Sequence, residues 1–219
     1  MKLHTLKREA GFSIIELVIA IGILALVVGL GVPNFRDMLT NLRVRSTAES
    51  LLGALQLSRS EGIRTNGIVI FQLMSSLENS CVVDTNGKFW VASLCPAEGA
   101  CGSTADRNQQ RPIAGCAGDA LILAKGPLEG SEITEITLSN GVVCFSGLGR
   151  INPAGTNCPA GSMDPLTSGG AVSMLVKNTD NVCTHEGGDV RCLQIDIGPG
   201  GESRMCDPAV SDSNDPRKC

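Results

Sequence analysis

The chain has 219 residues, a formal net charge of −4 and ten cysteines. This length leaves room for one domain of moderate size, and an acidic balance argues against general nucleic-acid binding, for which basic surfaces are suited. Residues 1–11 carry a net charge of +2, so the chain without them has a formal net charge of −6. All ten cysteines lie beyond residue 80, and this usage predicts disulfides formed in an oxidising compartment.

The N-terminal segment combines a basic leader with a long apolar run. Residues Gly11–Glu16 read GFSIIE, and apolar sequence continues from Leu17 to Val32. About 20 such residues cross a bilayer as a helix, and the basic leader predicts that its own side is cytoplasmic. A carboxylate inside an apolar span costs on the order of 3 kcal/mol, so Glu16 is a candidate functional residue.

Two simpler interpretations compete with a functional Glu16. A secretory signal peptide would end in a small-residue cleavage site, whereas this run ends in Gly31-Val32-Pro33-Asn34 and contains Glu16. A plain signal anchor with an incidental Glu16 is the second alternative.

Gly-Phe-Ser-Ile-Ile-Glu-Leu after a basic leader resembles the class III signal of type IV pilins and type II secretion pseudopilins. The resemblance implies that prepilin peptidase cuts after Gly11 and methylates Phe12. It also implies that Glu16 compensates the α-amino charge of Phe12, in its own or a neighbouring subunit. An ion pair of this kind reduces the cost of two charges in hydrocarbon. The expected location is the inner membrane with a periplasmic head, and later the pilus or cell surface.

The region after the apolar run continues the helical pattern. Pro33 is expected to kink the helix without ending it. Apolar residues then recur at three- and four-residue steps and form a stripe that can pack on a sheet: Phe35, Met38, Leu39, Leu42, Ala48, Leu51, Leu52 and Leu55. Asn66-Gly67 is a good helix stop. We therefore expect one helix of about 55 residues from Phe12.

Residues 55–66 read LQLSRSEGIRTN and resemble a segment shared by the GspH/FimT/FimU group of minor pilins and pseudopilins. Arg59 and Glu61 within it are expected to be solvated or paired locally.

Beyond Gly67, short β-like runs alternate with turn residues. The expected strands are Ile68–Leu73, Cys81–Val83, Phe89–Ser93, Leu121–Ala124, Ile133–Ser139, Val142–Phe145, Val172–Lys177, Val190–Ile197 and Glu202–Cys206. Asn140-Gly141 predicts a hairpin, and Gly200-Gly201 predicts a second reversal. The fold class is α+β, with a long helix on antiparallel sheet, as in the type IV pilin head that the resemblance implies.

Four regions follow from these patterns: a leader (1–11), a transmembrane assembly helix (12–33), an amphipathic helix (34–66) and a β-rich head with disulfides (67–219). Within the head, Cys95–Gly118 and Gly147–Gly170 are expected to be loops. Residues 145–150 resemble an F-x-x-x-G-R segment of the family, in which Arg150 is a structural or binding candidate.

Enzymatic motifs are missing from the sequence: it contains no phosphate loop, nucleophile elbow or HExxH pair. His185 is the one histidine beyond the leader. Cys183 and His185 with Cys192 could bind zinc, but a Cys183–Cys192 disulfide is favoured in an oxidising compartment. We expect no enzyme, cofactor or metal.

The C-terminal tail resembles that of FimT/FimU-like minor pilins, in which Cys206 and Cys219 would close a loop. FimT proteins active in transformation bind DNA through a Gly-Arg-x-Arg motif, to which Gly201-Glu202-Ser203-Arg204 corresponds here. Glu202 reverses the sign of one contact, and phosphate contacts dominate DNA affinity. DNA binding through Arg204, Arg217 and Lys218 is therefore a disfavoured alternative.

The function that these observations favour is that of a minor type IV pilin, which primes pilus assembly near the tip and supports twitching motility. Its expected partners are other minor and major pilins, prepilin peptidase and the inner-membrane assembly platform. The alternatives are a DNA-binding pilin for natural transformation and a minor pseudopilin of a type II secretion system.

Overall fold

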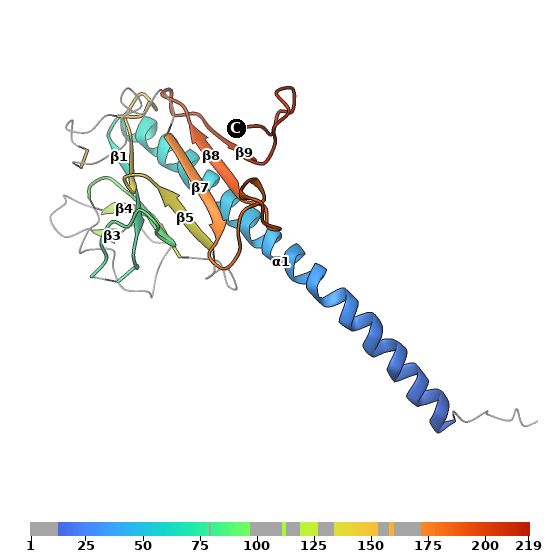
Figure 1. The fold of residues 1–219 in the computed structure, drawn as a ribbon. Helices are drawn as coiled ribbons and strands as arrows, with labels where there is room; N and C mark the ends of the chain where they lie inside the picture. Colours follow the sequence, from blue (N-terminus) through green and yellow to red (C-terminus); the bar gives the residue numbers. More distant parts are fainter. Residues whose placement is uncertain are drawn as a thin grey trace, which may run out of the picture. The chain divides into compact units, whose positions relative to one another are not determined.

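The computed structural model describes residues 13–78, 80–96, 111–112, 119–126, 134–152, 158–159 and 172–219, with the backbone alone at 30–34, 111–112 and 119–125. A long helix, α1 (Ile14–Thr65), precedes antiparallel strands and a short 3-10 helix (Figure 1). The chain divides into two compact units, Met1–Leu39 and Thr40–Cys219. In the parts described, no helix has both the length and the hydropathy needed to span a membrane.

Helix α1 ends where the sequence predicts. Asn66 has a left-handed φ of 48°. The backbone N–H of Asn66 donates to the carbonyl of Ile63 at 3.3 Å, and that of Gly67 donates to the carbonyl of Gly62 at 3.1 Å. These two bonds around a left-handed residue satisfy carbonyls that the helix end would otherwise leave free. At the other end the helix begins at Ile14, and the expected first residue, Phe12, lies outside the described residues.

The apolar stripe of α1 is buried in the part of the helix that belongs to the unit Thr40–Cys219. Ala48, Leu51 and Leu55 are fully buried, as is Val44, which the predicted stripe omitted. Phe35, Met38 and Leu42 are exposed within their own units, at 59%, 58% and 51%. Within the unit Thr40–Cys219, the part of the stripe that packs on the sheets therefore begins near Val44 and not at Leu42, because periodicity alone does not show how far along the helix the sheets extend.

Two antiparallel sheets form the head. The five-stranded sheet has the order β3-β4-β2-β1-β6. Its strands are β1 (Val69–Met74), β2 (Phe89–Ser93), β3 (Arg111–Pro112), β4 (Asp119–Lys125) and β6 (Val142–Phe145). The four-stranded sheet has the order β5-β7-β8-β9. Its strands are β5 (Thr134–Leu138), β7 (Val172–Asn178), β8 (Leu193–Ile197) and β9 (Ser203–Cys206). The expected α+β class is confirmed.

One core joins the helix to both sheets. It contains, among others, the fully buried side chains of Leu51, Leu55, Phe71, Phe145, Met174 and Ile195. Strands β5 and β7 bury alternate residues, so each has one face toward the core, whereas every residue of β1 and β6 is buried. Burial of each large apolar side chain contributes about 1.5–3 kcal/mol. The core therefore fixes the head on the second part of α1, from Thr40 onward.

The hairpin predicted at Asn140-Gly141 is wrong. A tight turn does form: Gly141 has a φ of 69°, and its N–H donates to the carbonyl of Leu138 at 3.0 Å. However, β5 belongs to the four-stranded sheet and β6 to the five-stranded sheet. The turn thus passes the chain between sheets. Local turn chemistry predicts a reversal and carries no information about which strand each segment pairs with.

Smaller differences also come from pairing between distant segments. The expected strand Cys81–Val83 is reduced to a single bridge between Met74 and Val83. Strand β8 begins at Leu193 and not at Val190, which instead forms a bridge with Cys183. Strand β3 lies inside a segment expected to be loop, because two residues including a proline show no period. The Gly200-Gly201 reversal is confirmed by the β8–β9 pairing.

Candidate functional site

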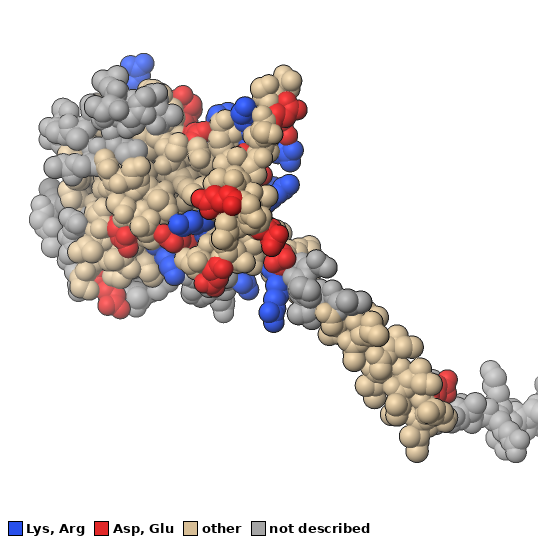
Figure 2. Space-filling view, viewed as in Figure 1, with Lys and Arg blue, Asp and Glu red and all other residues tan. Residues whose placement is uncertain are grey.

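The first turns of α1 form an exposed apolar surface with a single carboxylate. Residues 13–29 are all exposed, and Glu16 is the one charged residue among them. Figure 2 shows this stretch almost entirely in tan. Large contiguous apolar surfaces on a protein mark contact with another protein or a membrane. Gly11 and Phe12 lie outside the described residues, as does the side chain of Pro33.

Glu16 lies in the first turn of α1. This is the N-terminal end of the helix, where backbone N–H groups without an intrahelical acceptor favour a negative charge. Glu16 therefore has local electrostatic support from its own helix. A cationic group of another molecule could approach it, because the carboxylate is exposed.

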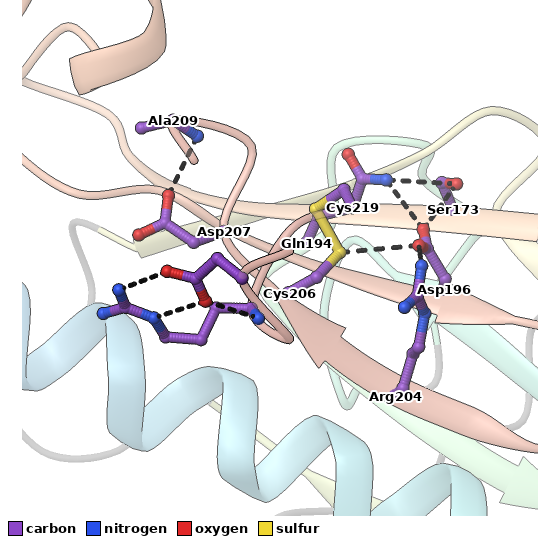
Figure 3. Close-up of a disulfide and its surroundings, with 10 residues drawn as sticks. Ser173, Gln194, Asp196, Arg204, Cys206, Asp207, Ala209 and Cys219 are labelled. Atoms are coloured by element: carbon purple, nitrogen blue, oxygen red, sulfur yellow. Dashed lines mark hydrogen bonds and ion pairs between the residues drawn. A yellow bond between two sulfur atoms is a disulfide. The ribbon is translucent and has the colours of Figure 1, made fainter. Parts of the chain in front are cut away.

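The C-terminal loop is closed by the Cys206–Cys219 disulfide (Figure 3). Asp207 follows directly and is buried. Its N–H donates to the carbonyl of Arg217 at 2.7 Å, and its Oδ1 accepts from the N–H of Ala209 at 2.9 Å. The loop is thus held by a covalent bond and by two hydrogen bonds of one buried residue, one through its backbone N–H and one through its carboxylate.

Each candidate DNA-binding cation already has an acceptor in the structure. The guanidinium of Arg204 lies 3.4 Å from a carboxylate oxygen of Asp196 (Figure 3). Arg217 forms two bonds with Asp215, one of 2.6 Å. Nζ of Lys218 donates to the carbonyl of Ser211 at 3.3 Å. Two of the three charges are therefore opposed by a carboxylate, which weakens the positive field that a phosphate would need.

The side-chain hydrogen bond from Arg217 lowers the pKa of Asp215 from 3.8 to about 2. The same hydrogen bond raises the pKa of Arg217. This pair is a local interaction on the loop, and Asp215 remains charged at any physiological pH.

Glu202, at the position where the DNA-binding motif has arginine, lies over the β8–β9 turn. A Cβ added at Gly198 or Gly200 would overlap the Glu202 carboxylate. The two glycines therefore leave space that the Glu202 side chain fills. Glutamate in place of the arginine of the motif therefore affects both the charge and the packing of this turn.

Further disulfides staple the head. Cys183 is bonded to Cys192, and Cys144 is bonded to Cys158. Cys81 and Cys95 are disulfide-bonded as well. Coordination of zinc by Cys183 and Cys192 would require two thiolates. In this state the two sulfur atoms are bonded to one another and are not thiolates.

Arg59 is the residue whose role the sequence interpretation missed. It was expected to be solvated or paired locally, but its Nε donates to the carbonyl of Gly149 at 3.0 Å. Glu61 does pair locally, with Arg64 at 2.7 Å. Arg150 is exposed, and its carbonyl accepts from the N–H of Ser146 at 2.8 Å. The family-like segments at 55–66 and 145–150 thus meet through Arg59, a contact that neither segment indicates alone.

Comparison with known proteins supports the N-terminal assignment. Residues 6–32 match the family model described as the prokaryotic N-terminal methylation motif. No curated protein matches the sequence significantly. Two crystal structures of the type IV minor pilin FimU from Pseudomonas aeruginosa are similar to this chain. One is 13% identical, with a TM-score of 0.46 over 77% of this chain and 97% of that chain. The other is 10% identical, with a TM-score of 0.45 over 78% and 92%.

This methylation motif is the N-terminal motif of type IV prepilins. The family match covers residues 6–32, the end of the leader and the apolar run. The resemblance of the N-terminal segment to the prepilin signal is confirmed over these residues.

Proposed function

We propose that this chain is a minor type IV pilin that takes part in priming pilus assembly and lies near the pilus tip. The observation that carries the proposal is the exposed apolar stretch of α1 with Glu16 as its one charge. Helices of other pilins would cover this stretch during assembly, so its apolar area is removed from lipid contact and packs against protein. The chain would thereby contribute to pilus biogenesis and twitching motility.

In this proposal, prepilin peptidase cuts after Gly11 and methylates Phe12. The chain then waits in the inner membrane with residues 34–219 in the periplasm. Glu16 pairs with the α-amino group of Phe12, its own or that of a neighbouring pilin, while the assembly platform brings subunits together. Breaking a buried pair by removing one partner costs several kcal/mol, so Glu16 selects subunits in the correct axial position.

The test replaces Glu16 in cells that make the pilus. Glu16→Gln keeps the size of the side chain and removes its charge, and Ile15→Leu is the matched control at a neighbouring exposed position. We expect both variants to reach the membrane at wild-type levels. The amount of Glu16→Gln in sheared surface filaments should fall at least about tenfold, since 1.4 kcal/mol already corresponds to a factor of ten. Wild-type amounts of Glu16→Gln in filaments would reject the role of Glu16.

A minor pseudopilin of a type II secretion system would have the same fold and the same Glu16 chemistry. Deletion of the gene separates the two: loss of surface pili with normal secretion supports the proposed function, and loss of secretion with normal pili supports the pseudopilin. DNA uptake is less favoured, because Arg204 and Arg217 are each paired with a carboxylate.

A further inference from the structure

The loop closed by the Cys183–Cys192 disulfide contains two further side chains that can bind a metal ion, those of His185 and Glu186. The 3-10 helix η2 (Thr184–Glu186) places His185 and Glu186 directly beside Cys183. One ligand atom from each of these three residues lies within 4.8 Å of the others. The sulfur of Cys192 is bonded to that of Cys183. The sulfur of Cys183, an imidazole and a carboxylate therefore converge at one end of the loop, and the sulfur of Cys192 adjoins this group through its bond to Cys183.

The loop backbone is held independently of the disulfide. The carbonyl of Cys183 accepts from the N–H groups of Glu186 and Gly188, both at 2.9 Å. The carbonyl of Val190 accepts from the N–H of Thr184 at 2.9 Å and from its hydroxyl at 3.0 Å. These bonds hold the loop ends together and orient η2, so opening the sulfur–sulfur bond leaves the surrounding backbone contacts in place.

The ligand set matches a tetrahedral zinc site. Bond lengths of about 2.0–2.3 Å to nitrogen, oxygen and sulfur place neighbouring ligand atoms roughly 3.3–3.8 Å apart. His185 and Glu186 are exposed, and their nearest N and O atoms are 3.9 Å apart. Small side-chain rotations would bring these atoms to ligand spacing. After reduction the sulfur of Cys192 would move about 2 Å further from that of Cys183 and rotate toward His185 and Glu186 to become the fourth ligand.

The geometry points to a redox-gated metal site: reduced Cys183 and Cys192, with His185 and Glu186, bind one Zn²⁺. A dithiol reductant gives two electrons and two protons to the disulfide, which becomes two thiols while the reductant becomes a disulfide. Binding of Zn²⁺ then releases the two thiol protons and leaves two thiolate ligands. The oxidised loop does not hold the ion, because its sulfurs are bonded to one another. This site is independent of the proposed role in pilus assembly.

A second cluster in the same chain provides an internal comparison. Ligand atoms of Asp196, Cys206 and Cys219 also lie within 4.8 Å of one another. The carboxylate of Asp196, however, already accepts from Ser173, Gln194 and Arg204 (Figure 3). This cluster contains no histidine, and its carboxylate is held by a cation. It should therefore bind Zn²⁺ much more weakly than the Cys183 loop.

The test measures protection of individual thiols in the full chain in detergent. The chain is reduced with a dithiol, the reductant is removed, and alkylation by N-ethylmaleimide is followed with and without Zn²⁺ by peptide mass mapping. Tryptic cleavage after Lys177, Arg191 and Arg204 puts Cys183, Cys192 and Cys206 in separate peptides. We expect Zn²⁺ to slow alkylation of Cys183 and Cys192 at least tenfold, and that of Cys206 much less.

Two variants decide whether the proposed ligands are responsible. His185→Ala keeps both thiols and should lower the affinity for Zn²⁺ at least about tenfold. Removal of a group that only hydrogen-bonds to a metal ligand already lowers metal affinity by about 10–100-fold. Asp189→Asn changes an exposed carboxylate of the same loop outside the cluster and should bind like wild type. Equal protection in wild type and His185→Ala, equal protection of Cys206, or no protection of Cys183 and Cys192 would each overturn the site.

Discussion

The guanidinium of Arg59, near the end of α1, donates a hydrogen bond of 3.0 Å to the carbonyl of Gly149, ninety residues further along the chain. The β8–β9 turn reaches the same place, because a Cβ added at Gly201 would overlap the carbonyl oxygen of Gly149 and lie 3.3 Å from Nε of Arg59. Gly149 and Gly201 have left-handed φ values of 71° and 78°. The helix, the 146–150 loop and the β8–β9 turn therefore meet at one junction.

Gly201→Ala should destabilise the head more than Gly187→Ala. Both glycines have a left-handed φ, at 78° and 92°, so both substitutions incur a backbone cost of roughly 1–2 kcal/mol. A Cβ at Gly187 meets nothing within 4 Å, whereas one at Gly201 meets Gly149. Urea unfolding followed by the fluorescence of Trp90, the single tryptophan, measures the difference. Equal losses would mean that the junction is not tightly packed.

Arg59→Ala should lower the free energy of unfolding by about 1.5–3 kcal/mol, the range for hydrogen bonds made by charged groups. Arg45→Ala is the matched control on the same helix. Arg45 pairs with Glu49 at 2.8 Å on an exposed surface, and such i,i+4 pairs contribute about 0.3–0.5 kcal/mol. The same unfolding assay compares the two variants. A similar small loss in both would show that Arg59 is not part of a stabilising junction.

Asp215 should titrate at about pH 2, below its ordinary value of 3.8. A carboxylate with a lowered folded pKa stabilises the fold fully above its unfolded pKa, and this contribution is lost as the pH falls from 3.8 through about 2. Carboxylate ¹³C chemical shifts across this range measure the pKa. Arg217→Ala should move the pKa upward toward 3.8, because the hydrogen bond from Arg217 is the main cause. An unchanged pKa in that variant would contradict the assigned cause.

Glu202→Arg should increase affinity for DNA, because it restores the Gly-Arg-x-Arg pattern and changes the local charge by two units. Fluorescence anisotropy with the full chain in detergent should show little binding by wild type at physiological salt. The variant should bind more tightly at low salt, with an affinity that falls as salt rises. Asp189→Arg makes the same charge change on another exposed loop and controls for net charge. Strong wild-type binding that is lost in Arg204→Ala would instead favour the DNA-uptake function.

Local sequence signals predicted the elements of this fold well. The left-handed Asn66 before Gly67 ends α1 through backbone bonds that span six residues. Strands β2 and β6 have the predicted bounds, Phe89–Ser93 and Val142–Phe145. The end of this helix and the bounds of these strands depend on residues close together in the sequence, so the local residue pattern is enough to predict them.

Features set by distant contacts were not predictable in the same way. The division of β5 and β6 between two sheets depends on the partners β7 and β1. The bond from Arg59 to Gly149 depends on the packing of the loop against the helix. The pairing of Cys206 with Cys219 was expected only through a family resemblance, since ten cysteines permit many connectivities. Convergence of His185 and Glu186 on Cys183 also required the turn of η2 to be seen.

The most direct test of pilin function is mass spectrometry of this chain recovered from sheared surface filaments. We expect the chain to be present in that fraction, with an N-terminal peptide that begins with Phe12 carrying one added methyl group. Absence from filaments in piliated cells would contradict a role in the pilus. An N-terminus at Met1, or cleavage beyond Val32 as in a secretory signal peptide, would contradict a helix that retains Glu16 for assembly.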